Sequence, residues 1–192
     1  MTGSNFRYRG LNHVALVCKD MKETVDFYTK VLEMKLVKTL DLPGGYGQHF
    51  FFDGGRGALI AFFWFPDAPE AAPGIASQNQ TPGMPITTAH GSMNHLAMDI
   101  PIEDFDACVE KLKSKGLKVR VINHADNDKG YTEGVTDETW IRSMYFTDPN
   151  GIALELAALT RPFNEGDVAH APATYEDRHR YLAQRPARNG AR

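Results

Sequence analysis

The first apolar segment of the chain reads LNHVALV at residues 11–17, and MNHLAMDI at residues 93–100 repeats its Asn-His core. Both segments have the pattern of a partly buried strand, and each is followed by an acidic, amphipathic stretch. Residues 21–36 and 102–115 place apolar side chains at helical spacing, and Gly116 follows the second stretch as a helix C-terminal cap. The repeat predicts two similar units that each open with a strand and then a helix.

The two halves also end alike, because DGGRGALIAF at residues 53–62 can be aligned with DPNGIALEL at residues 148–156. Each is a turn followed by an apolar strand. Two more segments with strand patterning lie between the helix and the last strand of each half. They are residues 36–42 and 48–52 in the first half, and residues 117–122 and 140–147 in the second. The sequence therefore predicts an α+β fold of two tandem βαβββ modules that form a curved mixed sheet.

Changes in composition set the boundaries of the modules. The stretch between the repeats is rich in Pro, Gly, Ala and Ser, which is typical of a linker, and the apolar pattern fades after the last strand. A polar stretch at residues 123–139 is longer than its counterpart in the first half and is expected to form a lid or binding loop. The expected parts are an N-terminal extension (1–9), the first module (10–66), a linker (67–92), the second module (93–160) and a C-terminal tail (161–192).

Composition argues against several classes of function. Hydrophobic residues make up 42% of the 192 residues and charged residues 23%, which is ordinary for a globular protein. The formal net charge of -3 favours neither nucleic acid nor a membrane surface as a partner, so a small-molecule substrate is expected. The first ten residues lack an apolar signal core, and the longest apolar run, at residues 58–65, is too short to span a bilayer. We expect a cytoplasmic protein with reduced cysteines.

Three polar residues lie in the middle of predicted strands. His13 and His95 hold equivalent positions in the two opening strands, and Glu155 lies in the last strand. Burying an imidazole or a carboxylate without a partner is costly, so each of the three needs something to bind. Each alone would be an ordinary core or surface residue. If the modules pair about a pseudo-twofold axis, however, the three side chains converge on one shared divalent metal ion.

These motifs resemble the vicinal oxygen chelate superfamily, which includes glyoxalase I, type I extradiol dioxygenases, methylmalonyl-CoA epimerase and fosfomycin-resistance enzymes. The resemblance covers residues 10–160 and is strongest in RSMYFTDPNGIALEL at residues 142–156. It implies up to four metal ligands, one on the first and one on the last strand of each module. Carried over, these positions are His13, Ala61, His95 and Glu155. Because alanine cannot bind a metal, the remaining set matches the extradiol and fosfomycin enzymes, and it suits Fe(II) or Mn(II) better than zinc.

The resemblance also implies that Tyr145 hydrogen-bonds a reaction intermediate, although a core aromatic residue would fit the same strand. His124, at the end of a strand that leads into the expected lid, is either an acid/base residue or an exposed loop histidine. An aromatic patch on the third and fourth strands of the first half either packs in the core or lines an apolar pocket. If Gln48 and Phe50 point toward the site, His49 points away, and a register error of one residue would reverse this. The residues expected to contact substrate are Gln48, Phe50, Phe63, Trp140 and Arg142.

Three functions remain open from the sequence. The leading interpretation is an extradiol-type dioxygenase that cleaves a catechol-like or other vicinally oxygenated hydrophobic molecule with Fe(II) and O2. It rests on the missing fourth ligand and on the aromatic patch. A glyoxalase-like lyase, isomerase or epimerase would use the metal as a Lewis acid without oxygen, and a metal-free protein that binds a hydrophobic ligand is the third alternative. Because some two-module relatives exchange modules between chains, the resemblance also implies a homodimer.

Overall fold

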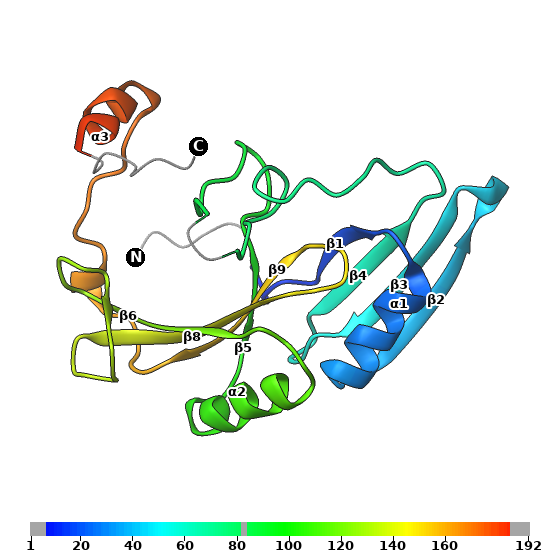
Figure 1. Cartoon of the computed structure of the whole chain (residues 1–192), viewed down its shortest axis with the longest axis horizontal. Coiled ribbons are helices and arrows are strands. Elements are labelled where there is room, and N and C mark those ends of the chain that lie inside the picture. Colours follow the sequence, from blue (N-terminus) through cyan, green and yellow to red (C-terminus); the bar gives the residue numbers. More distant parts are fainter. Residues whose placement is uncertain (1–6, 82–83, 185–192) are drawn as a thin grey trace. The chain divides into compact units, whose positions relative to one another are not determined.

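The structure is a computed structural model that describes residues 7–81 and 84–184. Its contacts divide the chain into two compact units, the second of which begins at Pro162. The first unit contains two successive modules, each a mixed sheet with a helix beside it (Figure 1). The α+β class and the two-module organisation predicted from the sequence are confirmed.

A four-stranded sheet forms the first module, with strand order β1-β4-β3-β2. Strand β1 runs parallel to β4, and the other neighbours are antiparallel. On β1 the alternate residues His13, Ala15 and Val17 are exposed, so this face of β1 is open within a single chain. The elements are β1 (His13–Cys18), α1 (Met21–Asp26), a π-helical turn η1 (Phe27–Val31), β2 (Leu36–Leu42), a 3-10 turn η2 (Pro43–Gly45), β3 (Gly47–Asp53) and β4 (Leu59–Trp64).

A five-stranded sheet forms the second module, with strand order β5-β9-β8-β6-β7. It repeats the pattern of the first, because the opening strand β5 runs parallel to the closing strand β9 and the other pairs are antiparallel. The elements are β5 (Leu96–Asp99), a 3-10 turn η3 (Ile102–Asp104), α2 (Phe105–Ser114), β6 (Arg120–Ala125), β7 (Tyr131–Thr132), β8 (Thr139–Thr147) and β9 (Ala153–Leu159).

The first helix is shorter than the sequence predicts. Asp20 caps its N-terminus, since the carboxylate accepts a hydrogen bond from the Glu23 amide at 2.9 Å. Regular α-helical structure ends at Asp26, and the π-helical turn ends at Val31, well before the expected end at residue 36. Glu33 then adopts a left-handed backbone with a φ of 59°, which prevents the helix from continuing.

Three differences from the predicted strands lie in the second half. The strand expected at residues 93–100 is β5, which begins only at Leu96, so His95 lies just before the strand and not in its middle. The strand expected at residues 117–122 is β6, which begins only at Arg120, where its pairing with Tyr145 of β8 starts. The expected lid at residues 123–139 is partly regular, since it contributes β7, which pairs with β6. Within the described ranges, the hydrogen-bonded strand pairs form one mixed sheet in each module.

The two modules share one hydrophobic core. From the first module Tyr28 and Phe62 are fully buried, and from the second Phe105 and Met144 are fully buried in the same cluster. Tyr28 comes from the π-helical turn and Phe105 from α2, so the helical segments of both modules contribute to it. Close packing of such side chains tolerates little displacement, so the shared core fixes how the two modules pack within one chain.

A buried polar contact reinforces this packing. Asp148, which is 4% exposed, begins the turn between β8 and β9 and accepts a 2.8 Å hydrogen bond from the Ile152 amide. The Tyr28 hydroxyl from the first module points at the same carboxylate, 3.4 Å away. Asn150 from this turn accepts a hydrogen bond from the Lys19 amide at 2.9 Å. Burial raises the pKa of Asp148 above its ordinary value, although its hydrogen bonds act in the opposite direction.

We expect Asp148→Ala to lower the free energy of unfolding by roughly 2–4 kcal/mol, because several buried donors lose their acceptor at once. Urea unfolding followed by circular dichroism measures the change. Glu70→Ala is the matched control, since that carboxylate is 84% exposed and its ion pair with Lys19 should contribute little. A loss for Asp148→Ala no larger than that of the control would contradict the role given to the buried contact.

The second unit is described by itself. It contains two 3-10 turns, η4 (Glu165–Asp167) and η5 (Tyr175–Asp177), followed by α3 (Arg178–Gln184). Each turn opens with a capping box, from Asn164 and Thr174 respectively. Throughout the part of the chain that the structure describes, no helix has the length and apolar character needed to cross a membrane.

Candidate metal centre

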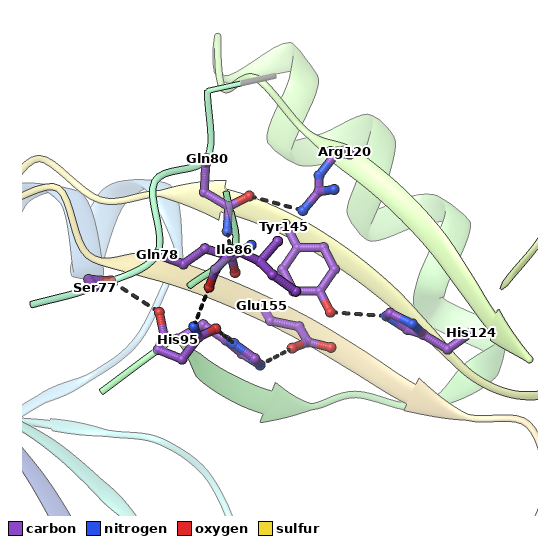
Figure 2. A network of polar contacts seen from close by, with 10 residues as sticks. Ser77, Gln78, Gln80, Ile86, His95, Arg120, His124, Tyr145 and Glu155 are labelled. Atoms are coloured by element: carbon purple, nitrogen blue, oxygen red, sulfur yellow. Dashed lines mark hydrogen bonds and ion pairs between the residues drawn. The ribbon is translucent and has the colours of Figure 1, made fainter. Parts of the chain in front are cut away.

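The centre of the site is a contact between two of the three predicted ligands. His95 lies directly before β5, and Glu155 lies in β9, where its neighbour on β5 is Ala97. The parallel pairing brings His95 Nε2 to 2.9 Å from Glu155 Oε2. A dashed line marks this contact in Figure 2. Glu155 is only 4% exposed. A carboxylate buried to this degree needs a close partner to balance its charge.

An asparagine fixes the orientation of His95. The Asn94 Nδ2 group donates a 2.7 Å hydrogen bond to the Ile86 carbonyl oxygen, so the Asn94 Oδ1 atom is the one that faces the imidazole. His95 Nδ1 lies 2.8 Å from this oxygen and must donate to it. The ring proton is therefore on Nδ1, which leaves the lone pair of Nε2 directed at the Glu155 carboxylate.

Two acceptors thus face each other at hydrogen-bond distance. An imidazole lone pair and a carboxylate repel unless a cation lies between them, and either a proton or a metal ion can serve. Burial raises the pKa of Glu155, but its contact with His95 and the nearby charges outweigh burial and hold the pKa below its ordinary value. Two ligand atoms that bind one metal ion at right angles, each with a bond of about 2.1 Å, lie about 3 Å from each other, which is close to the separation seen here. The residues present therefore fit a divalent metal ion.

His13 has the same local arrangement in the first module. Its Nδ1 atom lies 2.7 Å from the Oδ1 atom of the preceding Asn12, as His95 does with Asn94. His13 is exposed at the start of β1, and its ring centroid lies 6.1 Å from that of Phe51. Within residues 7–81 and 84–184 no three His, Cys, Asp or Glu side chains come together as a metal would require. The pair of His95 and Glu155 therefore lacks His13 within one chain.

Tyr145 and His124 lie beside the pair. Tyr145 is the direct neighbour of Glu155 across β8 and β9, and its hydroxyl is 3.1 Å from His124 Nε2 (Figure 2). Burial raises the pKa of the Tyr145 phenol and lowers that of the His124 imidazole, which favours the uncharged form of both at neutral pH. A neutral phenol bonded to a neutral imidazole can donate a hydrogen bond or pass on a proton. Trp140 lies near His124, with ring centroids 6.2 Å apart.

The direction of the β3 side chains corrects the predicted substrate contacts. Phe52 is fully buried against Tyr28, which by alternation turns Phe50 and Gln48 toward the core side of the sheet. His49 instead stacks on Phe63, with ring centroids 3.6 Å apart and planes 3° from parallel. Gln48, Phe50 and His49 therefore have the opposite orientation to the one predicted from the sequence, because a shift of one residue along a strand exchanges its two faces.

Arg142 also lies away from the cluster. Its guanidinium donates to Asp106 at 2.9 Å and lies 4.1 Å above the Phe105 ring, on the side of the sheet that packs on α2. The neighbouring residue Ser143 has the opposite direction and is fully buried beside Glu155 and Tyr145. Its hydroxyl lowers the pKa of both groups, yet among the described residues it makes no hydrogen bond of good geometry.

Arg120 is a site residue that the sequence argument missed. Its guanidinium lies 5.1 Å from the centre of the Tyr145 ring and 3.4 Å from the Gln80 side-chain oxygen (Figure 2). Among the described residues no acidic side chain forms an ion pair with Arg120. The alternation of Arg120, Ile122 and His124 along one strand could have identified it, had β6 been placed correctly.

Comparisons with known proteins identify the family of this chain. Residues 10–156 match the family model described as the Glyoxalase/Bleomycin resistance protein/Dioxygenase superfamily. A curated relative named "Putative ring-cleaving dioxygenase MhqE", from Bacillus subtilis, is 28% identical over 116 residues, which cover 57% of this chain and 33% of that protein. The fosfomycin resistance protein FosX of Listeria innocua is 26% identical over 152 residues, which cover 79% of this chain and 90% of that protein.

Solved structures share the fold. A glyoxalase family protein from Enterococcus faecalis superposes with a TM-score of 0.55 at 17% identity, over 78% of this chain and 98% of that chain. A mutant of FosX from Listeria monocytogenes, complexed with Mn(II) and 1S,2S-dihydroxypropylphosphonic acid, gives a TM-score of 0.50 at 22% identity, over 80% and 95% of the two chains. With the family model matching most of its length, this chain belongs to the glyoxalase, bleomycin resistance protein and dioxygenase superfamily.

Proposed function

We propose that the protein is a metal-dependent enzyme that acts on a vicinally oxygenated, hydrophobic small molecule, with extradiol-type ring cleavage by O2 as its reaction. The observation that carries the proposal is the buried contact of His95 Nε2 with Glu155, with the ring proton held on the other nitrogen by Asn94. This arrangement is unfavourable without a cation and suits a metal ion. MhqE, named as a ring-cleaving dioxygenase, supports oxygen chemistry as the first choice.

The metal would be held by His95, Glu155 and His13, and Fe(II) is the metal we propose, with Mn(II) or zinc as substitutes. When bound, such an ion supplies Lewis acidity and open positions at which two adjacent substrate oxygens can bind. The chain's own residues do the rest. The Tyr145 hydroxyl would relay a proton: it takes the proton of a substrate hydroxyl as it passes its own to the Nε2 atom of the uncharged His124, and the reverse transfer returns the proton.

His13 would come from a second copy of the chain. The face of β1 that bears His13 is open, and His13 does not join the other two ligands among the described residues of one chain. Pairing the first module of one copy with the second module of another would complete the ligand set twice in a homodimer. It would also cover the stacked rings of His49 and Phe63, which would then line a pocket for an aromatic substrate.

An oxygen-uptake screen tests the reaction. Protein reconstituted anaerobically with Fe(II) is mixed with air-saturated buffer and a series of catechols that differ in their substituents. The proposal predicts substrate-dependent oxygen consumption that is lost in Glu155→Ala. If no catechol consumes oxygen while the protein carries a full equivalent of iron, ring cleavage is ruled out.

A second candidate reaction needs no oxygen: a lyase, isomerase, epimerase or addition reaction on a substrate with an acidic group. The guanidinium of Arg120 favours it, and so does the Ser143 hydroxyl, which makes no hydrogen bond of good geometry among the described residues. Both flank Tyr145, and an anionic substituent would accept hydrogen bonds from both. The FosX relatives, which this chain matches over 90% of their length, also support it. Turnover under anaerobic conditions with Mn(II) would select this reaction. If the purified protein takes up no metal at all, the third alternative, a metal-free protein that binds a hydrophobic ligand, would be favoured instead.

The acid side of the pH profile should report on His124. Burial lowers the pKa of this imidazole below 6.5, so the neutral form required of a base is present at pH 7 and is lost as the pH falls through the lowered value. We therefore expect kcat to fall on the acid side, below pH 6.5. His124→Gln should reduce kcat by about 100-fold and remove that acid limb.

His170→Gln, in the second unit, is the control and should leave the profile unchanged. An acid limb that persists in His124→Gln would assign it to another group and contradict the role given to this histidine.

A further inference from the structure

A cavity of about 490 Å³ lies at the junction of the two modules, away from the metal centre. Ligand sites in proteins commonly have volumes of roughly 300–1,000 Å³, so the cavity is large enough for a small organic molecule. Both modules contribute apolar side chains to its walls. These are Val31, Leu32 and Met34 from the first module, and Met98, Ile100 and Leu156 from the second.

The β5–β9 pair separates this cavity from the metal centre. Leu156 follows Glu155 in β9, and Met98 follows Ala97 in β5, so their side chains point to the opposite side of the sheet. Leu156 and Met98 line the cavity, whereas Glu155 faces the metal centre. A molecule in the cavity therefore cannot touch the metal ligands, and the two sites are chemically independent.

The walls of the cavity adjoin the hydrophobic core, but most of their apolar side chains are not fully buried. Leu112 in its lining is 4% exposed, but the six apolar side chains named above are only partly buried, although they pack against the core cluster. Apolar surface left in contact with water costs about 25 cal/mol per Å². A ligand that covers this surface would recover that free energy, and the two methionines can adjust their shape to it.

Most charged groups at the rim already have a partner. The Asp53 carboxylate accepts a 2.9 Å hydrogen bond from the Gly55 amide, Lys35 is exposed to water, and the others form ion pairs. Glu33, in its left-handed conformation, forms ion pairs of 2.5 Å with Lys111 and 2.9 Å with Lys115, which join the two modules across the opening. Asp99 pairs with Arg56 at 3.4 Å. A charged ligand would have to break one of these pairs to gain Glu33, Asp99 or Lys111 as a partner, and the remaining cation, Lys35, is exposed to water. A neutral ligand would leave them intact.

We propose that this cavity is a second binding site, which takes a neutral, apolar small molecule of one or two rings. Because its walls come from both modules, the ligand would bind only when the modules are packed as they are here and would stabilise that packing. The proposal goes beyond the reaction proposed above and does not rest on it.

Fluorescence titration of the full-length protein with 6-propionyl-2-(dimethylamino)naphthalene, an uncharged two-ring fluorophore, tests the site. We expect saturable binding of one probe per chain, with a dissociation constant on the order of 1–10 µM. Cys108→Trp places an indole inside the cavity and should weaken binding at least about tenfold. Val168→Trp, at a position that is 85% exposed in the second unit, is the matched control and should not change the affinity.

Thiol protection locates the probe without any substitution. Cys108 lines the cavity and is partly exposed, whereas Cys18 is 1% exposed, so N-ethylmaleimide should react with Cys108 alone in the folded protein. Saturating probe should slow this alkylation at least about fivefold, and saturating Mn(II) should not displace the probe. No saturable binding, unprotected Cys108, or displacement of the probe by Mn(II) would each overturn the proposal.

Discussion

Glu155→Ala is expected to abolish stable metal binding while leaving the metal-free protein at least as stable as the wild type. Loss of a ligand should reduce metal affinity by more than the roughly 10–100-fold that removal of a supporting contact costs. In the metal-free state the substitution also removes a buried carboxylate, and the cost of burying that charge offsets what its proton-mediated contact with His95 at 2.9 Å contributes. The expected result is therefore less than about a tenth of an equivalent of metal per chain, with no fall in the unfolding midpoint of the metal-free form.

Elemental analysis after dialysis and thermal unfolding with and without Mn(II) give the two readouts. Glu133→Ala, which removes an exposed carboxylate near the β7 strand, is the matched control and should retain full metal content. If the metal-free Glu155→Ala protein were destabilised like an ordinary buried polar deletion, and metal uptake were unchanged, Glu155 would be a structural residue.

The largest qualitative effect is expected from mixing two inactive chains. His13→Ala and Glu155→Ala homodimers should each lack metal, because each loses one ligand in both sites. A heterodimer of the two chains would have one site that lacks both ligands and one that is intact, provided that His13 comes from the other copy. We expect tandem affinity purification of differently tagged chains to yield a heterodimer with about one metal ion, half of the wild-type content.

Pairing within one chain gives a different result. Each heterodimer site would then lack one ligand, and the purified heterodimer would be as empty of metal as its parents. A heterodimer of His95→Ala with Glu155→Ala is the internal control, since both residues lie in the same module of one chain and no intact site can form by either route.

The repeated Asn-His motif was sufficient to predict the two modules, because a strand, a helix and a turn recur around it in each half. The contact of His95 with Glu155 has a different origin from the one predicted, since it follows from the pairing of the opening and closing strands within one module and not from an axis between modules. The position of His13 does not follow from sequence. The same module surfaces can pair within a chain or between chains, and the choice depends on how the shared core packs.

The sequence-based predictions of single site residues failed in two places, each for a simple physical reason. The direction of Phe50 depends on which face of β3 is buried, and the consecutive phenylalanines Phe50, Phe51 and Phe52 fit a half-buried strand in either orientation. Burial of Phe52 against Tyr28 decides it. Arg120 was missed because the register of β6 is fixed by pairing with β8, a contact between residues far apart in the chain.

X-ray absorption spectroscopy of the full-length protein loaded with one equivalent of Fe(II) or Mn(II) is the most direct test of a metal held by His13, His95 and Glu155. The account predicts two imidazole nitrogens in the first coordination shell of the wild type and loss of this bound metal in His13→Ala. A wild-type spectrum with a single imidazole, or one that His13→Ala leaves unchanged, would contradict it.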